Sequence, residues 1–156
     1  MFKQGEKVIY PRYGLTKINR VYKEMLTNTK EDYYELRFSN NLLVSIPAKN
    51  AEKLGLRYPM NSKMLTDELK MLTQAYTIPE ELLGSYNDFM TDLLATGMIP
   101  DAINVIRLYK QLLIQTKDQP KQPLNSTREI YLEAVENVKT EIKAVLGEQV
   151  LPKYKI

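Results

Sequence analysis

The stretch Val44–Arg57, which reads VSIPAKNAEKLGLR, decides how the first third of this chain folds. It begins with apolar and polar side chains in alternation, which is typical of a β-strand. Pro47 then ends the strand, because proline has no backbone N–H to donate to a neighbouring strand. A short polar piece follows and closes on Leu54–Arg57. The physical pattern alone predicts one more strand and a turn here.

The composition of the chain is that of a globular protein. Its 156 residues suffice for one medium domain or two small ones, and 44% hydrophobic and 26% charged residues make an ordinary balance. No apolar run approaches the roughly 20 residues that span a bilayer. The first residues, MFKQGEKVIYP, lack the apolar core of a signal peptide. We therefore expect a cytoplasmic protein that does not engage a membrane.

The sequence contains no cysteine and no histidine. The first absence removes disulfides, thiolate metal sites and thiol catalysis. The second removes the side chain most used as a general base near neutral pH, which is also the commonest metal ligand. No nucleophile motif, glycine-rich phosphate loop or carboxylate cluster at ligand spacing takes their place. We therefore expect no catalytic residues, no metal and no cofactor, and a protein that is not an enzyme.

Charge divides the chain into two parts. Residues 1–61 hold 11 Lys and Arg against 6 Asp and Glu, a net charge of +5, whereas residues 62–156 hold 11 against 13, a net charge of −2. A basic half suits an acidic partner surface on a protein, or a nucleic acid. An ordinary solvated surface is the alternative that charge alone leaves open.

Hydrophobic periodicity changes at nearly the same place. Up to residue 57 the apolar residues follow the period of 2 that strands show, and from Ser62 onward the period is about 3.6. The predicted strands are 7–10, 15–23, 33–38 and 42–46, with a polar hairpin tip at 25–32. The predicted helices cover 64–76, 86–94, 100–113 and 126–145, the last opened by a capping box of Ser126 and Glu129. The tail 148–156 shows no periodicity.

Three groups of residues resemble the CarD/CdnL family of bacterial RNA polymerase-binding regulators. The first group, in the opening stretch, is Ile46-Pro47, Asn50-Ala51-Glu52 and Gly55-Leu56-Arg57. The second is Phe2, Gly5-Glu6, Val8, Ile9-Tyr10-Pro11 and Gly14, and the third is Leu94–Gly97 followed by Val105–Arg107. The N-terminal module of this family also heads the transcription-repair coupling factor. The resemblance is strong over the first sixty residues or so and weaker beyond them.

The resemblance implies both a fold and a partner. The family's N-terminal domain is a small SH3-like or Tudor-like β-barrel, so we expect an α+β protein with a β domain over 1–59 and a compact helical domain over 60–156. In the family the β domain docks on the RNA polymerase β subunit through strand edges and nearby cations. Carried across by position, the polymerase-binding candidates are Arg20, Lys23, Arg37, Leu43, Val44, Ser45 and Ile46. Ordinary surface charge is the alternative for each cation.

The helical domain departs from the family pattern. Family members touch promoter DNA there, with a tryptophan that wedges into the minor groove within a run of arginines and lysines. This sequence has no tryptophan, and residues 84–93, GSYNDFMTDL, hold two aspartates and no cation. The positions that correspond to DNA contacts are Leu83, Tyr86, Arg107 and Lys110. Because carboxylates oppose phosphate contacts, we expect weak intrinsic DNA affinity.

Two alternatives concern single residues and three concern the whole protein. Arg107 can bridge helices instead of touching DNA, and Tyr86 can belong to the core. The resemblance implies a monomeric transcription regulator that binds the RNA polymerase β subunit and modulates promoter open-complex stability, with exchange of the β domain between copies as an alternative. The rival function is an adaptor that docks on polymerase and recruits or blocks another protein without touching DNA. A binder of some other partner that shares only the barrel is a third possibility.

Overall fold

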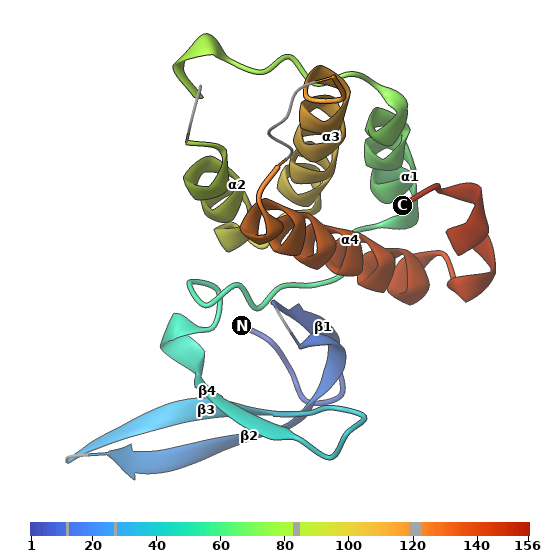
Figure 1. Cartoon of the computed structure of the whole chain (residues 1–156). Helices are drawn as coiled ribbons and strands as arrows, with labels where there is room; N and C mark the ends of the chain where they lie inside the picture. The colour runs from blue at the N-terminus through green and yellow to red at the C-terminus, as the bar shows by residue number, and fades with distance from the viewer. Residues whose placement is uncertain (12, 27, 83–84, 119–122) are drawn as a thin grey trace. The chain divides into compact units, whose positions relative to one another are not determined.

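The protein, seen here in a computed structural model, is described over residues 1–11, 13–26, 28–82, 85–118 and 123–156. The chain divides into two compact units, Met1–Pro59 and Met60–Ile156. The first unit contains the strands and the second contains the α-helices (Figure 1). The predicted α+β class is therefore confirmed.

The first unit is built around one antiparallel sheet with the strand order β1-β2-β3-β4. The strands are β1 (Lys7–Tyr10), β2 (Gly14–Leu26), β3 (Thr29–Arg37) and β4 (Leu43–Pro47), followed by the short 3-10 helix η1 (Ala48–Asn50). The sheet curls, as Figure 1 shows, and Arg57 returns to the free side of β1. The Ile9 N–H donates to the Arg57 carbonyl at 2.7 Å, and the Arg57 N–H donates back at 3.1 Å. The result is a half-barrel, in agreement with the predicted small Tudor-like fold.

The inner face of this half-barrel holds its core. Ile18, Tyr34, Leu36 and Ile46 are each 2% exposed or less and come from three neighbouring strands. Phe2 closes the open side, because its backbone N–H donates to the Tyr34 hydroxyl at 3.1 Å and its ring meets the Tyr34 ring edge-on at 5.7 Å. The first residues of the chain therefore form part of the packed unit.

The hairpin predicted at residues 25–32 is present, but its tip is shorter than predicted. β2 continues to Leu26 and β3 begins at Thr29, and these two residues pair with each other. Asn28 has a φ of 68°, an angle that asparagine tolerates better than most residues. The polar composition that indicated a loop belongs to strands that run beyond the core, where Lys23, Glu24 and Met25 are exposed.

The second unit is a bundle of α-helices joined by short 3-10 segments. The α-helices are α1 (Ser62–Leu69), α2 (Tyr86–Ala95), α3 (Ile99–Gln115) and α4 (Asn125–Val145), and the 3-10 helices are η2 (Lys70–Thr73), η3 (Glu80–Leu82) and η4 (Glu148–Lys153). Asn61 starts α1 because its side chain accepts the Met64 N–H at 2.8 Å. Pro100 lies in the first turn of α3, where its missing N–H costs no hydrogen bond.

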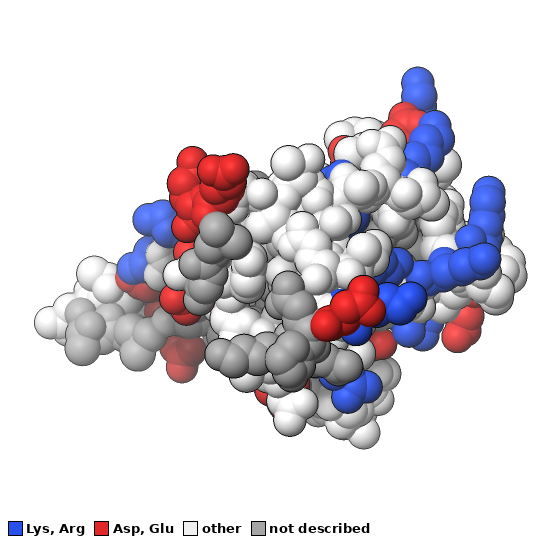
Figure 2. Space-filling view, turned by 45° about the horizontal axis from the view of Figure 1, so that its top comes forward, with Lys and Arg blue, Asp and Glu red and all other residues white. Residues whose placement is uncertain are grey.

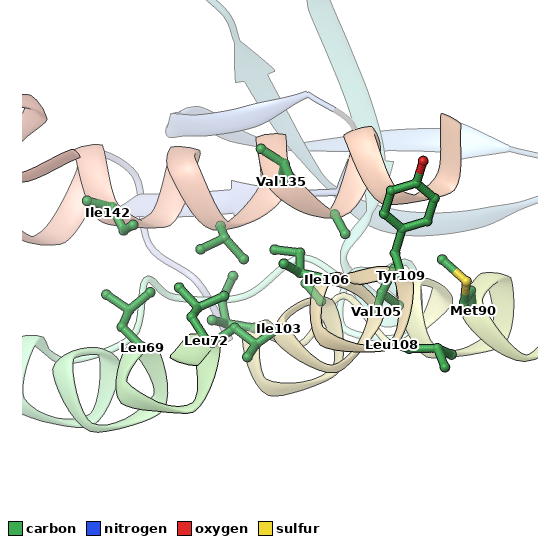
Figure 3. Packing of buried hydrophobic residues seen from close by; sticks show 14 of the residues in the cluster. Leu69, Leu72, Met90, Ile103, Val105, Ile106, Leu108, Tyr109, Val135 and Ile142 are labelled. Atoms are coloured by element: carbon green, nitrogen blue, oxygen red, sulfur yellow. The ribbon is translucent and has the colours of Figure 1, made fainter. Parts of the chain in front are cut away.

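Helix α3 lies at the centre of the hydrophobic core of this unit. Figure 3 shows Ile103 and Ile106 of α3 facing Val135 and Ile142 of α4. Leu69 closes the same core from α1. The strict 3.6-residue spacing of these side chains explains why the sequence predicts the helices well.

The capping box predicted at Ser126 and Glu129 is wrong. Helix α4 begins one residue earlier, so Ser126 lies inside its first turn. The Ser126 hydroxyl instead accepts the side-chain N–H of Asn87 at 2.8 Å, and the Thr127 hydroxyl donates to the Asn87 oxygen at 2.6 Å. These bonds connect α4 to α2, so a tertiary partner takes the side chain that a local cap would have used.

The tail 148–156 is part of the fold although it shows no periodicity. Gly147, with a φ of 93°, ends α4, and η4 follows. Leu151 and Tyr154 pack against the helical core. The Lys110 side chain of α3 donates to the Lys155 carbonyl at 3.2 Å. The tail is therefore held against the unit by apolar contacts and by one hydrogen bond from α3.

Candidate functional site

Strand register divides the sheet residues between an inner face and an outer face. Residues that stand directly opposite each other on neighbouring strands share a face. Three cross-strand rows point away from the core and form what we call the outer face: Lys17–Arg37–Leu43, Arg20–Glu35–Ser45 and Tyr22–Tyr33–Pro47. The outer face is thus the part of the sheet that is available to a partner.

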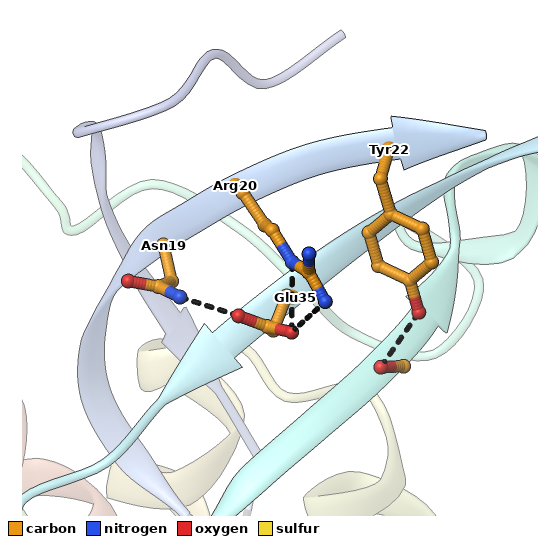
Figure 4. A network of polar contacts seen from close by, with 5 residues as sticks. Asn19, Arg20, Tyr22 and Glu35 are labelled. Carbon is orange, nitrogen blue, oxygen red and sulfur yellow. Dashed lines mark hydrogen bonds and ion pairs between the residues drawn. The ribbon is translucent and has the colours of Figure 1, made fainter.

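The middle row is a polar network (Figure 4). The Arg20 guanidinium contacts one carboxylate oxygen of Glu35 through two nitrogens, at 2.8 and 3.0 Å. The Asn19 amide donates to the other oxygen. These hydrogen bonds, from Asn19 first and then from Arg20, lower the pKa of Glu35 from its ordinary value of 4.5. Glu35 is 7% exposed, so the network keeps a nearly buried carboxylate charged.

The third row adds aromatic rings to the same surface. The rings of Tyr22 and Tyr33 are stacked with centroids 5.7 Å apart, and the Arg20 guanidinium lies 4.7 Å from the Tyr22 ring centroid. The Tyr22 hydroxyl donates to the Ser45 hydroxyl at 3.0 Å, which joins β2 to β4 across β3 (Figure 4). Stacking and hydrogen bonding together hold this part of the outer face in one arrangement.

The first row is a line of cations. Lys7 of β1 stands opposite Lys17 of β2, and Lys17 stands opposite Arg37 of β3. All three are exposed, and within the described residues none of them makes an ion pair. Like charges directly opposite each other destabilise a sheet. An anionic partner surface would relieve that repulsion, so this row is the most informative feature of the outer face.

The free edge of the sheet adjoins the same row. Within the described part of the chain, β4 pairs with β3 on one side and has no strand on the other. Leu43, at the start of β4, is 49% exposed and belongs to the cation row. An unpaired strand edge can accept a strand from another protein through main-chain hydrogen bonds.

The structure brings four of the seven predicted polymerase-binding residues to the outer face, namely Arg20, Arg37, Leu43 and Ser45. The other three lie on the opposite face: Ile46 is in the core, Val44 packs against it, and Lys23 stands 4.0 Å from Asp32. Arg20 is also committed to Glu35. The sequence reasoning missed Lys7 and Lys17, although the period of 2 places them beside Arg37 once the strand register is known.

The predicted DNA-contacting residues do not form one surface in the part of the chain that is described. Leu83 lies outside the described residues. Tyr86 is half-buried and packs against the helical core. Arg107 donates to the carbonyls of Gln74 and Ala75 at 3.0 and 2.7 Å and to the Asn104 side chain at 2.9 Å.

The guanidinium of Arg107 therefore fixes the segment that follows η2. This is the bridging arrangement that the sequence left open for Arg107. Lys110, one turn further along α3, holds the tail through the Lys155 carbonyl.

No helix in the described ranges is long and apolar enough to cross a membrane. Nowhere among the same residues do three or more Asp or Glu side chains gather in a way that could hold a metal ion.

The two most specific sequence stretches meet in space. Gly55 has a φ of 87°, and a Cβ atom built on it would lie 2.6 Å from the Pro11 ring. Arg57, two residues later, makes the paired hydrogen bonds with Ile9. The motif ending in Gly55-Leu56-Arg57 therefore packs against the motif Ile9-Tyr10-Pro11.

Comparison with protein families agrees with this arrangement. The model of the CarD-like/TRCF RID domain matches residues 2–58. The match includes all four strands and the returning segment at Arg57, and it ends within the first unit. RID domains of this kind interact with the β subunit of RNA polymerase. The half-barrel and both signature stretches therefore lie within the part of the chain, residues 2–58, that is similar to the CarD-like/TRCF RID domain.

Proposed function

We propose that this protein is a non-catalytic transcription regulator of the CarD type. It binds the β subunit of RNA polymerase through the outer face and the β4 edge of its sheet, and it modulates the stability of the promoter open complex. The helical unit lies beside promoter DNA and grips it weakly. The observation that carries the proposal is the row Lys7–Lys17–Arg37 on a matched RID domain.

The cation row supports docking on an acidic protein surface. Charges of one sign on a rigid face steer encounter with a partner and fix its register. The neighbouring edge at Leu43 provides main-chain groups that give affinity without demanding particular side chains. Together these features fit a partner that offers both carboxylates and an extended segment.

The weak grip on DNA is supported by the helical unit. Asp88 and Asp92 are exposed on α2, where the family has cations. Arg107 already donates hydrogen bonds to the backbone carbonyls that follow η2. Carboxylates near phosphates reduce the electrostatic part of binding. A polymerase-bound protein nevertheless has a high effective concentration at the promoter, so a weak contact can act there.

The same aspartates favour the second candidate function, an adaptor. Asp88 and Asp92 lie four residues apart, so they share one side of α2 and make an acidic stripe. An adaptor would use this stripe to recruit or block a basic protein. Promoter lifetime separates the two functions, because an adaptor alone leaves the open complex of purified polymerase unchanged.

The test is binding to a purified RNA polymerase β-subunit lobe, with Lys17 and Arg37 both changed to Glu. We expect about tenfold or greater loss of affinity, because both reversals place like charges against an acidic surface. The matched control is Lys30→Glu with Lys53→Glu, two exposed lysines outside the outer face. Equal affinity of the two double variants would refute docking through the cation row. An unchanged open-complex lifetime with the wild-type protein would refute the regulator and leave the adaptor.

A further inference from the structure

The helical unit contains a pocket of about 610 Å³ that the docking proposal does not use. It lies where α1 and η2, α3 and the end of η4 meet. Its lining combines a small apolar floor with polar residues, namely Thr66, Leu69, Lys70, Leu72, Thr73, Lys110, Lys153, Tyr154 and Lys155. A volume in this range suits a small ligand or a ligand fragment, for which pockets of about 300–1,000 Å³ are usual.

The pocket gathers lysines in a unit that is acidic as a whole. Four of the 11 Lys and Arg residues in 62–156 line it, although that segment has a net charge of −2. No carboxylate is among its lining residues. In Figure 2, Lys and Arg side chains stand out along the side where Figure 1 shows α1 and η4. The composition of the unit does not account for this concentration of charge.

The four ammonium groups are only partly neutralised. Lys70 is paired with Asp67 at 2.7 Å, a contact that raises the pKa of Lys70. Lys110 donates to a backbone carbonyl, which removes no charge. Lys153 and Lys155 are exposed and make no ion pair within the described residues. About three positive charges therefore remain unmatched around one concavity.

The fold holds the floor of the pocket and the backbone of the tail in place before any ligand arrives. Leu69 and Leu72 belong to the helical core, so the floor is fixed. Tyr154 also packs against that core, between Lys153 and Lys155 in sequence. The Lys110 hydrogen bond to the Lys155 carbonyl then ties the tail to α3 at 3.2 Å.

We propose that this pocket is a phosphate-binding site. Phosphate groups bring about two negative charges and three strong acceptor oxygens each, which suits several lysines around one cavity. The apolar floor with Tyr154 gives room for a ribose or a base next to the phosphates. The phosphates come either from a nucleic acid backbone or from a free nucleotide. The site does not depend on polymerase docking, since it lies on the other unit of the chain.

The test is calorimetric titration of the full chain with inorganic tripolyphosphate and, separately, with a duplex of about 20 base pairs. We expect one tripolyphosphate per chain. Changing Lys153 and Lys155 together to Gln should weaken binding about tenfold or more, because two positive charges that face the phosphates are removed. The matched control is Lys63→Gln with Lys117→Gln, which removes the same charge from exposed positions of the same unit outside the pocket lining. Thermal melting of both variants verifies that each is folded.

Each outcome decides a point. Weaker binding by the pocket variant than by the control supports the site. If the duplex competes with tripolyphosphate and loses affinity with the same variant, the backbone of nucleic acid is the source of the phosphates. If the duplex does not compete, the ligand is a free phosphorylated molecule. Absence of tripolyphosphate binding, or equal loss in both variants, overturns the proposal while leaving polymerase docking untouched.

Discussion

Gly55 shows how one residue without a side chain fixes the first unit. Its φ of 87° lies in the left-handed region, and the Pro11 ring occupies the space that a Cβ would need at 2.6 Å. Two separate reasons therefore require glycine here, backbone conformation and close approach. Gly5 has nearly the same φ of 86° but nothing within 4 Å of its Cβ position. A substitution at Gly5 therefore tests the effect of backbone conformation alone.

The variant Gly55→Ala should lower the free energy of unfolding of the first unit by roughly 3 kcal/mol, combining backbone strain with overpacking against Pro11. Gly5→Ala should cost only about 1–2 kcal/mol, because strain alone remains. Urea titration followed through NMR signals of sheet residues measures both, since the two units can unfold separately. Equal losses in the two variants would show that the contact with Pro11 contributes nothing.

Glu35 gives the first unit a pH dependence. Its pKa is lowered in the folded protein by hydrogen bonds from Asn19 and Arg20, so the charged form is the one that folding favours. A depressed carboxyl pKa stabilises the fold above the ordinary value of 4.5, and that stabilisation disappears as the pH falls through the lower folded value. The Arg20 interaction is thus fully present at neutral pH.

We expect the urea midpoint of the sheet signals to fall as the pH is lowered from 6 towards roughly 3, and to fall less steeply in Glu35→Gln, because this variant carries no carboxyl to protonate. Glu24→Gln, at an exposed strand position, serves as the control. If the urea midpoint falls with pH equally steeply in the wild type and in Glu35→Gln, Glu35 has no role in the pH dependence of stability.

At the scale of single elements, the sequence predicts what local pattern controls. The 3.6-residue stripe of α3 and the alternation of Tyr34 and Leu36 in β3 lead directly to the observed helix and strand, because one face of each is buried. The far ends of β2 and β3 are missed because they lack a buried face. The tail is missed because η4 packs through irregularly spaced residues, Leu151 and Tyr154.

The candidate site is predicted less completely than the fold. Arg37 and Leu43 were found because the family pattern indicates their strands. Lys7 and Lys17 were missed because their proximity to Arg37 depends on pairing between three strands, which no local signal contains. Lys153 and Lys155 were missed for the same reason, since only the folded tail brings them near Lys70 and Lys110.

Arg107 acts at the scale of an element, because it connects α3 to the segment that follows η2. Replacing Arg107 with Gln should lower the stability of the helical unit by about 1–2 kcal/mol, since hydrogen bonds from a charged donor to the carbonyls of Gln74 and Ala75 are lost. NMR signals of the helical unit in urea provide the measurement. Arg128→Gln removes an exposed arginine from α4 and should have little effect.

The same pair of variants discriminates between the two uses of Arg107. If Arg107 contacts DNA, Arg107→Gln should leave the free energy of unfolding of the helical unit unchanged and reduce the protein's effect on the lifetime of the promoter open complex. If Arg107 only bridges α3 and the segment after η2, Arg107→Gln should lower the free energy of unfolding. At temperatures where the unit stays folded, it should leave the effect on open-complex lifetime unchanged. Unchanged stability in Arg107→Gln would therefore contradict the structural role.

At the scale of the whole molecule, function is divided between the two units. The first has the cation row and the open strand edge, and residues 2–58 within it match the CarD-like/TRCF RID domain. The second has an acidic stripe on α2 and a lysine-lined pocket formed by α1, η2, α3 and the end of η4. If the lysine-lined pocket binds phosphates as proposed, the acidic stripe gives the same unit a second surface that repels nucleic acid.

The contact of Gly55 with Pro11 has a practical meaning for protein engineering. Segments 9–11 and 55–57 contact each other through the Gly55–Pro11 packing and the Ile9–Arg57 bridge, although they are more than forty residues apart in the chain. A chimera that takes only one of these segments from another RID domain would pair two segments that do not fit each other. A chimera that takes both segments together keeps their contact intact. Recombination points for such hybrids therefore belong outside both segments.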